Sequence, residues 1–374
     1  MARPPIKIAP LTEADTESMF ELYAEAFSPS AARDFRARST WMFRHNPVDA
    51  RAPAWVAKSE DAVVGHLATV AQEYRVDGKP VRALYPCDFM VREGFGMQGI
   101  ALMRECFRAA PNVISLDEVK ATQTVLKLMK VTHVGATQKW IKPLDFRFAR
   151  LRASRARHVP EPLLALARGP LAAYDAVRGL RSPHGPRVEP MAPSARGTFD
   201  ARFDRFAARH AEVARAVLHR DAAYLSWRYG QWSPHASRFV GLATDSGGEL
   251  RGYVIGCSLA GRENAGLVLE LHTLEPADTE LWRALLGFAV RQLRAEGSSY
   301  VRMHHLETPH TAPASLLHEL GFLPRPLAQE LTIRFADAEA MAGARELSGW
   351  SYAFGDSETS YSLTGTSEAA VLPA

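Results

Sequence analysis

The pattern of apolar and polar positions changes period several times along the first 145 residues. Ile6-Lys7-Ile8 alternates as a short strand does. Two further alternating runs, Trp55 to Lys58 and Val63 to Val70, predict a hairpin, and the next hairpin turns at Asp77-Gly78, a strong local turn signal. The first helix is predicted from apolar residues at helical spacing: Met19, Leu22, Tyr23 and Phe27.

The remaining patterns of this half predict alternating strands and helices. They are a hydrophobic run from Val81 to Val91, a helical pattern from Leu102 to Ala109, a strand near Val113 to Leu116, a helix from about Thr122 to Met129 and a strand near Thr137 to Ile141. These patterns therefore predict that residues 1–145 form an α/β unit.

A glycine-containing stretch, Val91 to Ala101, joins the hydrophobic run to the helical pattern. A strand that turns through glycines into a helix leaves several N–H groups pointing one way at the positive end of the helix dipole. That geometry suits a phosphate or pyrophosphate. A glycine cluster between a strand and a helix is also ordinary turn chemistry, so both interpretations stay open here.

This stretch resembles the acetyl-CoA pyrophosphate loop of the GCN5-related N-acetyltransferase (GNAT) superfamily, a valine followed after a few residues by Gln/Arg-x-x-Gly-x-Gly/Ala. Gln98, Gly99 and Ala101 match the pattern, whereas Gly96 stands at the first Gln/Arg position and Glu93 at the usual proline. The predicted order of elements also resembles the GNAT fold. The resemblance implies acetyl-CoA as acyl donor, held at Gly96, Met97, Gln98, Gly99 and Ala101.

The resemblance also implies a mechanism, in which an amine or hydroxyl attacks the thioester directly. The strand before the loop splays from its neighbour, and the backbone of Met90 and Val91 would hydrogen-bond the pantetheine arm. Asp88 is the first candidate for the base that deprotonates the nucleophile. Strand alternation puts Asp88 and Met90 on one face and Phe89 and Val91 on the other. A strand-end hydrogen bond to a turn is the alternative role of Asp88.

The leaving thiolate is commonly protonated by a tyrosine in this superfamily. No tyrosine follows Tyr85 in the first half. Another group or solvent would have to serve, or the domain is catalytically impaired.

A weak internal repeat predicts that the second half has the same fold. Phe43-Arg44 is echoed by Trp227-Arg228, Gly65 by Gly252, and Gly135 by Gly321. The separations agree, with 65 − 44 = 21 against 252 − 228 = 24 and 135 − 65 = 70 against 321 − 252 = 69. We therefore expect an α/β (α+β, mixed-sheet) protein with two tandem GNAT-like domains joined by a helical linker.

The expected division has four parts. These are an acyl-CoA-binding domain at 1–145, an Arg/Pro/Ala-rich linker at 146–197, a degenerate GNAT-like domain for substrate binding or scaffolding at 198–335, and a tail at 336–374 whose start Trp350, Tyr352 and Phe354 could anchor.

The second half lacks the glycines of the proposed phosphate loop. The equivalent stretch, Leu274 to Leu281, gathers Glu275, Asp278 and Glu280 at a helix start. Acidic residues cap a helix well but repel a pyrophosphate, by about 1 kcal/mol per contact near a surface. The second domain is therefore predicted not to bind acetyl-CoA in the usual mode.

Two other groups of side chains are candidates for a functional role. Adjacent strand residues such as His304 and His305 point to opposite faces, so with His310 and His318 they predict a polar cleft rim and no metal site. Trp41 to Arg44 is expected to be an aromatic packing element, with an anionic substrate facing Arg44 as the alternative.

Composition narrows the range of partners and locations. The net charge of +4 over 374 residues makes nucleic acid an unlikely partner, and three spaced cysteines support no disulfide framework. No apolar run reaches membrane-spanning length and no signal peptide is evident, so we expect a cytoplasmic protein. The linker is expected to pack across the domain interface. Alternatively, Arg168, Arg178 and Arg181 could rest it on a membrane surface.

These observations lead to an acyltransferase that moves an acetyl or other acyl group from CoA to an amine or hydroxyl. The acceptor would be a small molecule, or a saccharide in cell-surface polysaccharide synthesis by family analogy. The alternatives are an aminoacyl transferase of the FemABX type and a non-catalytic binding protein built from two degenerate domains. The sequence does not set the oligomeric state.

Overall fold

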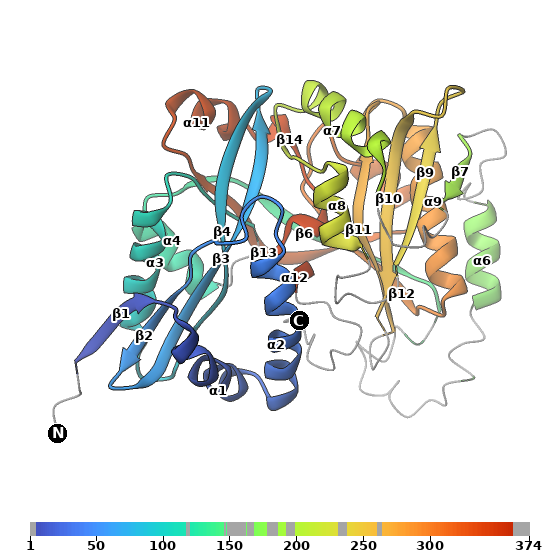
Figure 1. The fold of residues 1–374 in the computed structure, drawn as a ribbon. Helices are drawn as coiled ribbons and strands as arrows, with labels where there is room; N and C mark the ends of the chain where they lie inside the picture. The colour runs from blue at the N-terminus through green and yellow to red at the C-terminus, as the bar shows by residue number, and fades with distance from the viewer. Residues whose placement is uncertain are drawn as a thin grey trace.

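A computed structural model describes residues 5–116, 120–145, 147, 162, 168–177, 186–191, 199–230, 238–259 and 264–361. Its main feature is a mixed sheet of 14 strands that runs through the whole molecule (Figure 1). The strand order is β1-β2-β3-β4-β5-β13-β6-β12-β11-β10-β9-β7, with β8 pairing to β3 and β14 to β8. None of the described helices is long and apolar enough to cross a bilayer.

The first half follows the predicted order closely. Its elements are β1 (Ile6–Pro10), α1 (Thr16–Ala26), α2 (Pro29–Arg44), β2 (Trp55–Ser59), β3 (Ala62–Val76), β4 (Lys79–Val91), α3 (Met97–Ala109), β5 (Val113–Ser115), α4 (Lys120–Leu128) and β6 (Thr132–Pro143). The hairpin turn is confirmed, since Asp77 and Gly78 both have positive φ, 47° and 77°. One detail was wrong. Phe27 lies beyond the end of α1 and is 62% exposed, so it does not join the buried stripe.

The second half repeats this arrangement. Its elements are α7 (Ala201–Val213), β8 (Ala216–Leu218), α8 (Ala222–Tyr229), β9 (Arg238–Thr244), β10 (Leu250–Ser258), β11 (Ala265–Thr273), α9 (Thr279–Ala295), β12 (Tyr300–His305), α10 (Ala314–Glu319) and β13 (Leu323–Arg334). After it come α11 (Ala338–Arg345), β14 (Trp350–Ser351) and α12 (Glu358–Tyr361), with short 3₁₀ turns η4 (Leu347–Gly349) and η5 (Phe354–Asp356).

Each half covers both faces of its part of the sheet with helices. In the first half α3 and α4 pack on one face, and α1 and α2 pack on the other (Figure 1). In the second half α9 and α10 form one layer, and α7 and α8 the opposite layer. These layers bury the apolar residues that produced the helical and strand periods in the sequence.

The two halves share strands at their junction. The last strand of the second half, β13, lies between β5 and β6 and pairs antiparallel with both. The last strand of the first half, β6, pairs with β12. The sheet is therefore continuous across the predicted domain boundary, and the boundaries at 145 and 198 stay a prediction.

Reciprocal tryptophan contacts relate the two halves. The Trp41 indole N–H donates to the carbonyl of Trp227 at 2.7 Å, and the Trp227 indole donates to the carbonyl of Trp41 at 3.0 Å. The rings stack with centroids 5.2 Å apart. Trp41 and Trp227 therefore occupy equivalent positions in the two halves. The repeat found in the sequence paired Phe43 with Trp227 and Arg44 with Arg228, so the structural match differs from it by two residues. The packing role predicted for Trp41 is confirmed.

The two glycine matches of the repeat fare differently. A Cβ at Gly65 would lie 3.1 Å from Leu102 of α3, and a Cβ at Gly252 would lie 3.0 Å from Leu285 of α9. Both glycines therefore let the helix after the hairpin approach the strand. The match of Gly135 with Gly321 is wrong, because Gly135 lies within β6 whereas Gly321 turns the chain after α10 with φ +81°.

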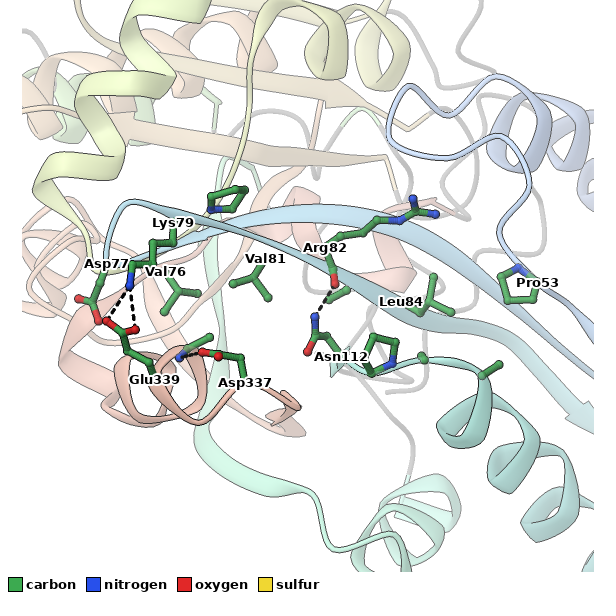
Figure 2. A pocket seen from close by; sticks show the side chains of 16 residues that line it. Pro53, Val76, Asp77, Lys79, Val81, Arg82, Leu84, Asn112, Asp337 and Glu339 are labelled. Atoms are coloured by element: carbon green, nitrogen blue, oxygen red, sulfur yellow. Dashed lines mark hydrogen bonds and ion pairs between the residues drawn. The ribbon is translucent and has the colours of Figure 1, made fainter.

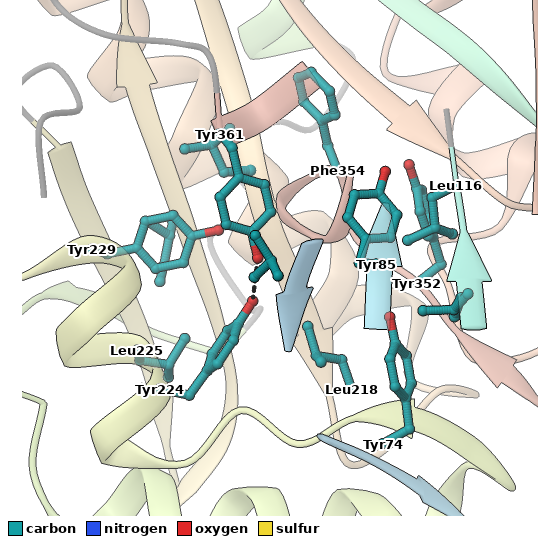
Figure 3. Close-up of a cluster of buried hydrophobic side chains, with 14 of the residues drawn as sticks. Tyr74, Tyr85, Leu116, Leu218, Tyr224, Leu225, Tyr229, Tyr352, Phe354 and Tyr361 are labelled. Atoms are coloured by element: carbon teal, nitrogen blue, oxygen red, sulfur yellow. Dashed lines mark hydrogen bonds between the residues drawn. The ribbon is translucent and has the colours of Figure 1, made fainter. Parts of the chain in front are cut away.

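Residues 346–361, here named the C-terminal segment, cross the centre of the molecule. Trp350, Tyr352 and Phe354 are buried, which confirms that they anchor the start of the tail. Their aromatic rings join one cluster with tyrosines from both halves, as Figure 3 shows for Tyr85 and Tyr224. The segment after residue 361 lies outside the described residues.

The described part of the predicted linker includes one helix, α6 (Arg168–Val177), and the edge strand β7 (Val188–Pro190). Asp175 on α6 accepts a 2.6 Å bond from Lys142 of β6 and also pairs with Arg294 of α9. The helix is therefore held both by the last strand of the first half and by a helix of the second half, as expected of a linker that packs across the junction. Arg178, Arg181 and the side chain of Arg168, named for membrane contact, lie outside the described residues.

Candidate active site

The predicted phosphate turn has an open helix start. The helix α3 begins at Met97, after Gly94 at φ +83°. A Cβ placed on Gly96 would meet nothing within 4 Å, and the Met97 side chain is 73% exposed. No acidic residue lies in the first turn, so the positive end of the helix dipole faces open space.

The backbone amides of this turn divide into two groups. The amides of Gln98 and Gly99 donate to the carbonyls of Phe95 and Gly96, at 2.8 and 3.1 Å. The amides of Gly96 and Met97 have no acceptor among the residues that the structure describes. Gly99 also has a packing role, because a Cβ there would lie 3.0 Å from Phe89. The structure therefore gives Gly99 a packing role, and phosphate binding at Gly96 and Met97 stays a prediction.

The end of the strand before the turn, Phe89 to Val91, has a free edge on the side of β5 among the described residues. β4 pairs with β5 at one position, Leu84 with Val113, and the two strands then separate. On its other side β4 stays paired with β3 as far as Val91. The end of β4 from Phe89 to Val91 therefore has the splay expected of a strand that could hydrogen-bond an extended ligand.

Asp88 lies at an irregularity on this strand. The pairing of β3 with β4 shifts register beside it, and Asp88 has φ +48°, a left-handed conformation that a non-glycine residue rarely adopts. Such strain is characteristic of functional sites. The predicted faces are confirmed, since Met90 packs with α1 and α2, whereas Phe89 and Val91 pack with α3.

The Asp88 carboxylate is buried in an ion pair. Its Oδ1 accepts a 2.6 Å bond from Arg38 of α2, and the two side chains are 3% and 2% exposed. Arg38 also donates to the Tyr23 hydroxyl at 3.1 Å, and burial raises the pKa of Tyr23 to about 12. The second oxygen, Oδ2, is buried without a hydrogen-bond partner among the described residues. The carboxylate therefore contacts α2 and not a turn, contrary to the alternative role considered from the sequence.

His66 and the C-terminal segment bind the backbone of Asp88. His66 Nδ1 lies 3.0 Å from the Asp88 carbonyl, and burial lowers the pKa of His66. Since a carbonyl only accepts, Nδ1 carries the proton, and Nε2 of the neutral ring is left as a proton acceptor. On the other side, the Asp88 amide donates to Glu358 Oε1 at 2.6 Å, and the Glu358 amide donates to the Tyr85 hydroxyl at 2.8 Å.

The equivalent strand gap of the second half is filled by the chain itself. β11 pairs with β12 from Ala265 to Leu267, and η5 then contacts both strands. Phe354 stacks on His304 with ring centroids 3.8 Å apart, and a Cβ on Gly355 would overlap the Glu270 carboxylate. Nearby, Arg220 bridges Glu270 and Asp356 in a buried ionic cluster.

The helix start of the second half is occupied by its own acidic side chains. Asp278 accepts the Leu281 amide at 3.0 Å as the helix cap, which confirms the predicted capping. Arg251 forms ion pairs with both Glu275 and Asp278. The first half alone therefore combines a free strand edge with an open helix N-terminus among the described residues.

Comparison with known proteins places this architecture. No protein-family model and no curated protein sequence matches the chain. Solved structures do match at low identity. An Anabaena variabilis GCN5-related N-acetyltransferase aligns with TM-score 0.57 at 13% identity, over 89% of this chain and 73% of that one. One from Kribbella flavida aligns with TM-score 0.56 at 17% identity, over 91% and 74%. The chain has the GNAT fold.

A further solved structure with a similar fold is a myristoyltransferase. Saccharomyces cerevisiae N-myristoyltransferase with bound myristoyl-CoA aligns with TM-score 0.52 at 12% identity, over 88% of this chain and 82% of that one. The predicted fold class, a mixed α/β sheet with two GNAT-like halves, is thus confirmed.

Two cavities flank the sheet of the first GNAT half. The larger, about 710 Å³, lies between α1, α2 and β2–β3, and His66 lines it. The other, about 590 Å³, lies beside the β3–β4 hairpin and α11 (Figure 2). Both of its cationic side chains already have acidic partners, Lys79 with Glu339 at 2.7 Å (Figure 2) and Arg82 with Asp49. The cavity at His66 adjoins Asp88 and is the one that belongs to the candidate site.

The histidines of the second GNAT half are structural. His304 and His305 point to opposite faces, as predicted, with His304 stacked on Phe354 and His305 bonded to the Ala312 carbonyl at 2.9 Å. Both are buried, so the predicted polar rim is wrong for these two, whereas His318 is exposed. No cluster of three metal-binding side chains occurs in the described ranges.

Sequence reasoning found Asp88 but missed its partners. Arg38 gave a signal, because it occupies a buried position of α2 at helical spacing from Phe35 and Met42. A charged residue within an apolar stripe predicts a buried partner. His66 and Glu358 gave none, since neither stands out by spacing from its neighbours.

Proposed function

We propose that the first half transfers an acyl group, acetyl by preference, from CoA to an amine or hydroxyl of a small-molecule acceptor in the cytoplasm. The observation that carries this proposal is the combination of a free β4 edge with an open α3 N-terminus at its end. A strand edge can hydrogen-bond an amide-containing arm, and a helix N-terminus can bind the phosphates that follow it. Coenzyme A has these two chemistries in this order.

Each residue predicted to bind the cofactor has a role in this proposal. Met90 and Val91 would bind the pantetheine arm along the free edge. The amides of Gly96 and Met97 would donate to the pyrophosphate, since they have no acceptor within the described part of the chain. Gln98, Gly99 and Ala101 complete the first helical turn that supplies the dipole. When bound, the CoA thioester supplies the electrophile.

The second half supports the proposal by contrast. Its strand gap holds Phe354 and Gly355, and its helix start carries paired carboxylates. Neither position is open to a pyrophosphate or to a thioester arm. The second half would instead supply the scaffold that seats the C-terminal segment beside Asp88.

The proton of the attacking nucleophile could go to either of two groups. The sequence candidate is Asp88, whose Oδ1 is held by Arg38 and whose Oδ2 has no hydrogen-bond partner among the described atoms. The geometry favours His66, because its Nε2 is a proton acceptor, lines the larger cavity and is oriented by the bond from Nδ1 to the Asp88 carbonyl. Asp88 then acts as the group that positions His66 and α2.

Calorimetric titration with acetyl-CoA tests the cofactor site. Gly96→Asp places a negative charge at the helix start, where the added side chain has room. Gly96→Asn has nearly the same shape without the charge. We expect micromolar binding to the wild type, at least tenfold weaker binding to Gly96→Asp and little change for Gly96→Asn.

Turnover distinguishes the rival functions. Release of free CoA in the presence of an acceptor, detected with a thiol reagent, supports the enzyme. Absence of heat with the wild-type protein would contradict the proposal and favour an aminoacyl transferase. Binding of acetyl-CoA without release of CoA over a broad amine panel would favour a non-catalytic binding protein.

A further inference from the structure

The cavity beside His66 has an apolar interior. Its volume of about 710 Å³ is within the range of small-molecule sites. Met19 and Phe20 of α1 and Phe35 of α2 form buried parts of its wall. His66 lies at its base and is 1% exposed. Within the described residues, His66 Nε2 has no hydrogen-bond partner and so is left to a ligand in the cavity.

The rim of the same cavity is cationic. Arg36, Arg44 and Arg51 line it, and no aspartate or glutamate does. Arg36 is already neutralised by Glu17, which it binds through both guanidinium nitrogens at 2.7 and 2.6 Å. Arg44 and Arg51 have no acidic partner in the described ranges of the chain. Two positive charges are therefore left over at the mouth of an apolar cavity.

The loop that carries Arg51 is held in place. Asn46 is buried and bridges the loop to the sheet, with its side-chain amide donating to the Ala71 carbonyl at 2.9 Å and its Oδ1 accepting the Val48 amide at 2.8 Å. Asp49 accepts the Arg51 amide at 2.7 Å. Since Arg44 ends α2, both arginines are presented from fixed backbone, which reduces the entropy lost when they bind a ligand.

We propose that this cavity binds the acceptor through an anionic group, a carboxylate or a phosphate, held between Arg44 and Arg51. The apolar body of the ligand lies on Met19, Phe20 and Phe35. Guanidinium groups favour these anions because they donate two parallel hydrogen bonds. The inference deepens the proposed function by naming the acceptor class, and it depends on that function only in calling the ligand an acceptor.

The geometry relates this ligand to the candidate site. The base of the cavity, His66, bonds to the carbonyl of Asp88, and Arg38 stacks over the Phe35 ring at 4.8 Å while pairing with Asp88. A ligand anchored by its anion at the rim extends its other end toward His66 Nε2. An acceptor with its anionic group at one end and its amine or hydroxyl at the other fits this arrangement.

The test uses four probes on the full chain without any acyl-CoA. The probes are 3-phenylpropionate, phenyl phosphate, the neutral 3-phenylpropanamide and the cationic 3-phenylpropylamine, and binding is followed by calorimetry and by the fluorescence of Trp55, which lines the cavity. We expect both anions to bind at least tenfold more tightly than the amide, and the amine to bind most weakly. The preferred anion distinguishes a carboxylate ligand from a phosphate ligand.

Substitutions locate the binding. Arg44→Gln/Arg51→Gln should weaken the anions at least tenfold and leave the amide unchanged, whereas Arg44→Lys/Arg51→Lys should restore part of the loss. The matched control is Arg33→Gln/Arg104→Gln, two exposed arginines outside the cavity, one of them on the same helix α2. All four positions are exposed, so folding is retained.

The outcomes separate this inference from the proposed function. Anion binding that survives in Arg44→Gln/Arg51→Gln, equal binding of acid and amide, or no anion binding by the wild type would overturn the inference. Each of these results is compatible with tight acetyl-CoA binding at Gly96. Conversely, anion selectivity without acetyl-CoA binding supports the anion-binding cavity and contradicts the acyltransferase.

Discussion

The ion pair between Arg38 and Asp88 gives a prediction whose size follows from burial alone. The two side chains are 2% and 3% exposed and meet at 2.6 Å, so neither charge has water as an alternative partner. Removing one member of a buried pair leaves the other charge desolvated and costs about 3–5 kcal/mol. Arg38→Met, which keeps most of the aliphatic length, should therefore lower the free energy of unfolding by about 3–5 kcal/mol.

The structure supplies a matched control on the same two helices. Arg36 of α2 binds Glu17 of α1 at the same distance, 2.6 Å, but those side chains are 52% and 73% exposed. Solvent and salt screen such a pair, and its side chains lose entropy when they pair. Arg36→Met should therefore leave the urea midpoint essentially unchanged, although distance and residue type are the same as in the buried pair.

The assay is urea unfolding followed by tryptophan fluorescence, completed by a double-mutant cycle. Asp88→Asn keeps the shape of the side chain and tolerates positive φ, so it removes the charge and little else. The cycle with Arg38→Met should give a coupling energy of about 2 kcal/mol or more. Two results would refute the reasoning, namely an Arg38→Met loss no larger than that of Arg36→Met, or single-mutant losses that simply add.

Three further predictions concern the C-terminal segment and the junction of the halves. Gly355→Ala should destabilise by about 1–3 kcal/mol, because a Cβ there overlaps the Glu270 carboxylate, and thermal unfolding would show a lower Tm. Burial raises the pKa of Asp356 from 3.8 to about 6, so the folded state holds the proton of this carboxyl more tightly than the unfolded state does. The stability that this proton gives the fold is present below pH 4 and is lost as the pH rises toward 6. As the pH rises from 4 to 7, the free energy of unfolding of Asp356→Asn should increase by about 1–3 kcal/mol relative to that of the wild type. A difference between the two proteins that does not change with pH would contradict this. Trp41→Phe and Trp227→Phe each remove one reciprocal indole bond and should cost about 1 kcal/mol apiece, with equal losses expected from the shared geometry.

Local sequence patterns predicted the features that depend on interactions between residues close together in the chain. The strands and helices of the first half, the turn at Asp77-Gly78 and the shared face of Asp88 and Met90 follow from side-chain period and turn chemistry within short windows. The helix α3 starts at Met97, five residues before the predicted start at Leu102, which shows the usual limit of such reasoning, because helix boundaries are the least certain part of a pattern.

The local patterns could not predict which strands pair with one another. The insertion of β13 between β5 and β6 depends on residues more than 180 positions apart, as in the pairing of Leu331 with Gly135. A strand's own sequence shows which face is buried but does not say which neighbour it pairs with. The candidate site was incomplete for the same reason, since Glu358 reaches Asp88 from the far end of the chain.

The C-terminal segment explains why two halves with the same order of elements differ in what they could bind. In each half the strand before the main helix separates from its next parallel neighbour after a short pairing, β4 after Leu84 and β11 after Leu267. The segment inserts Phe354 and Gly355 into the second gap, where the backbone passes so close to Glu270 that no side chain fits. It reaches the first gap only through α12, where the half-buried Glu358 carboxylate binds the amide of the strained Asp88. The hydrogen bonds that Glu358 makes at the first gap are far easier to exchange for a ligand than a packed aromatic residue at the second, so the proposed difference in binding follows from how deeply one segment enters each gap.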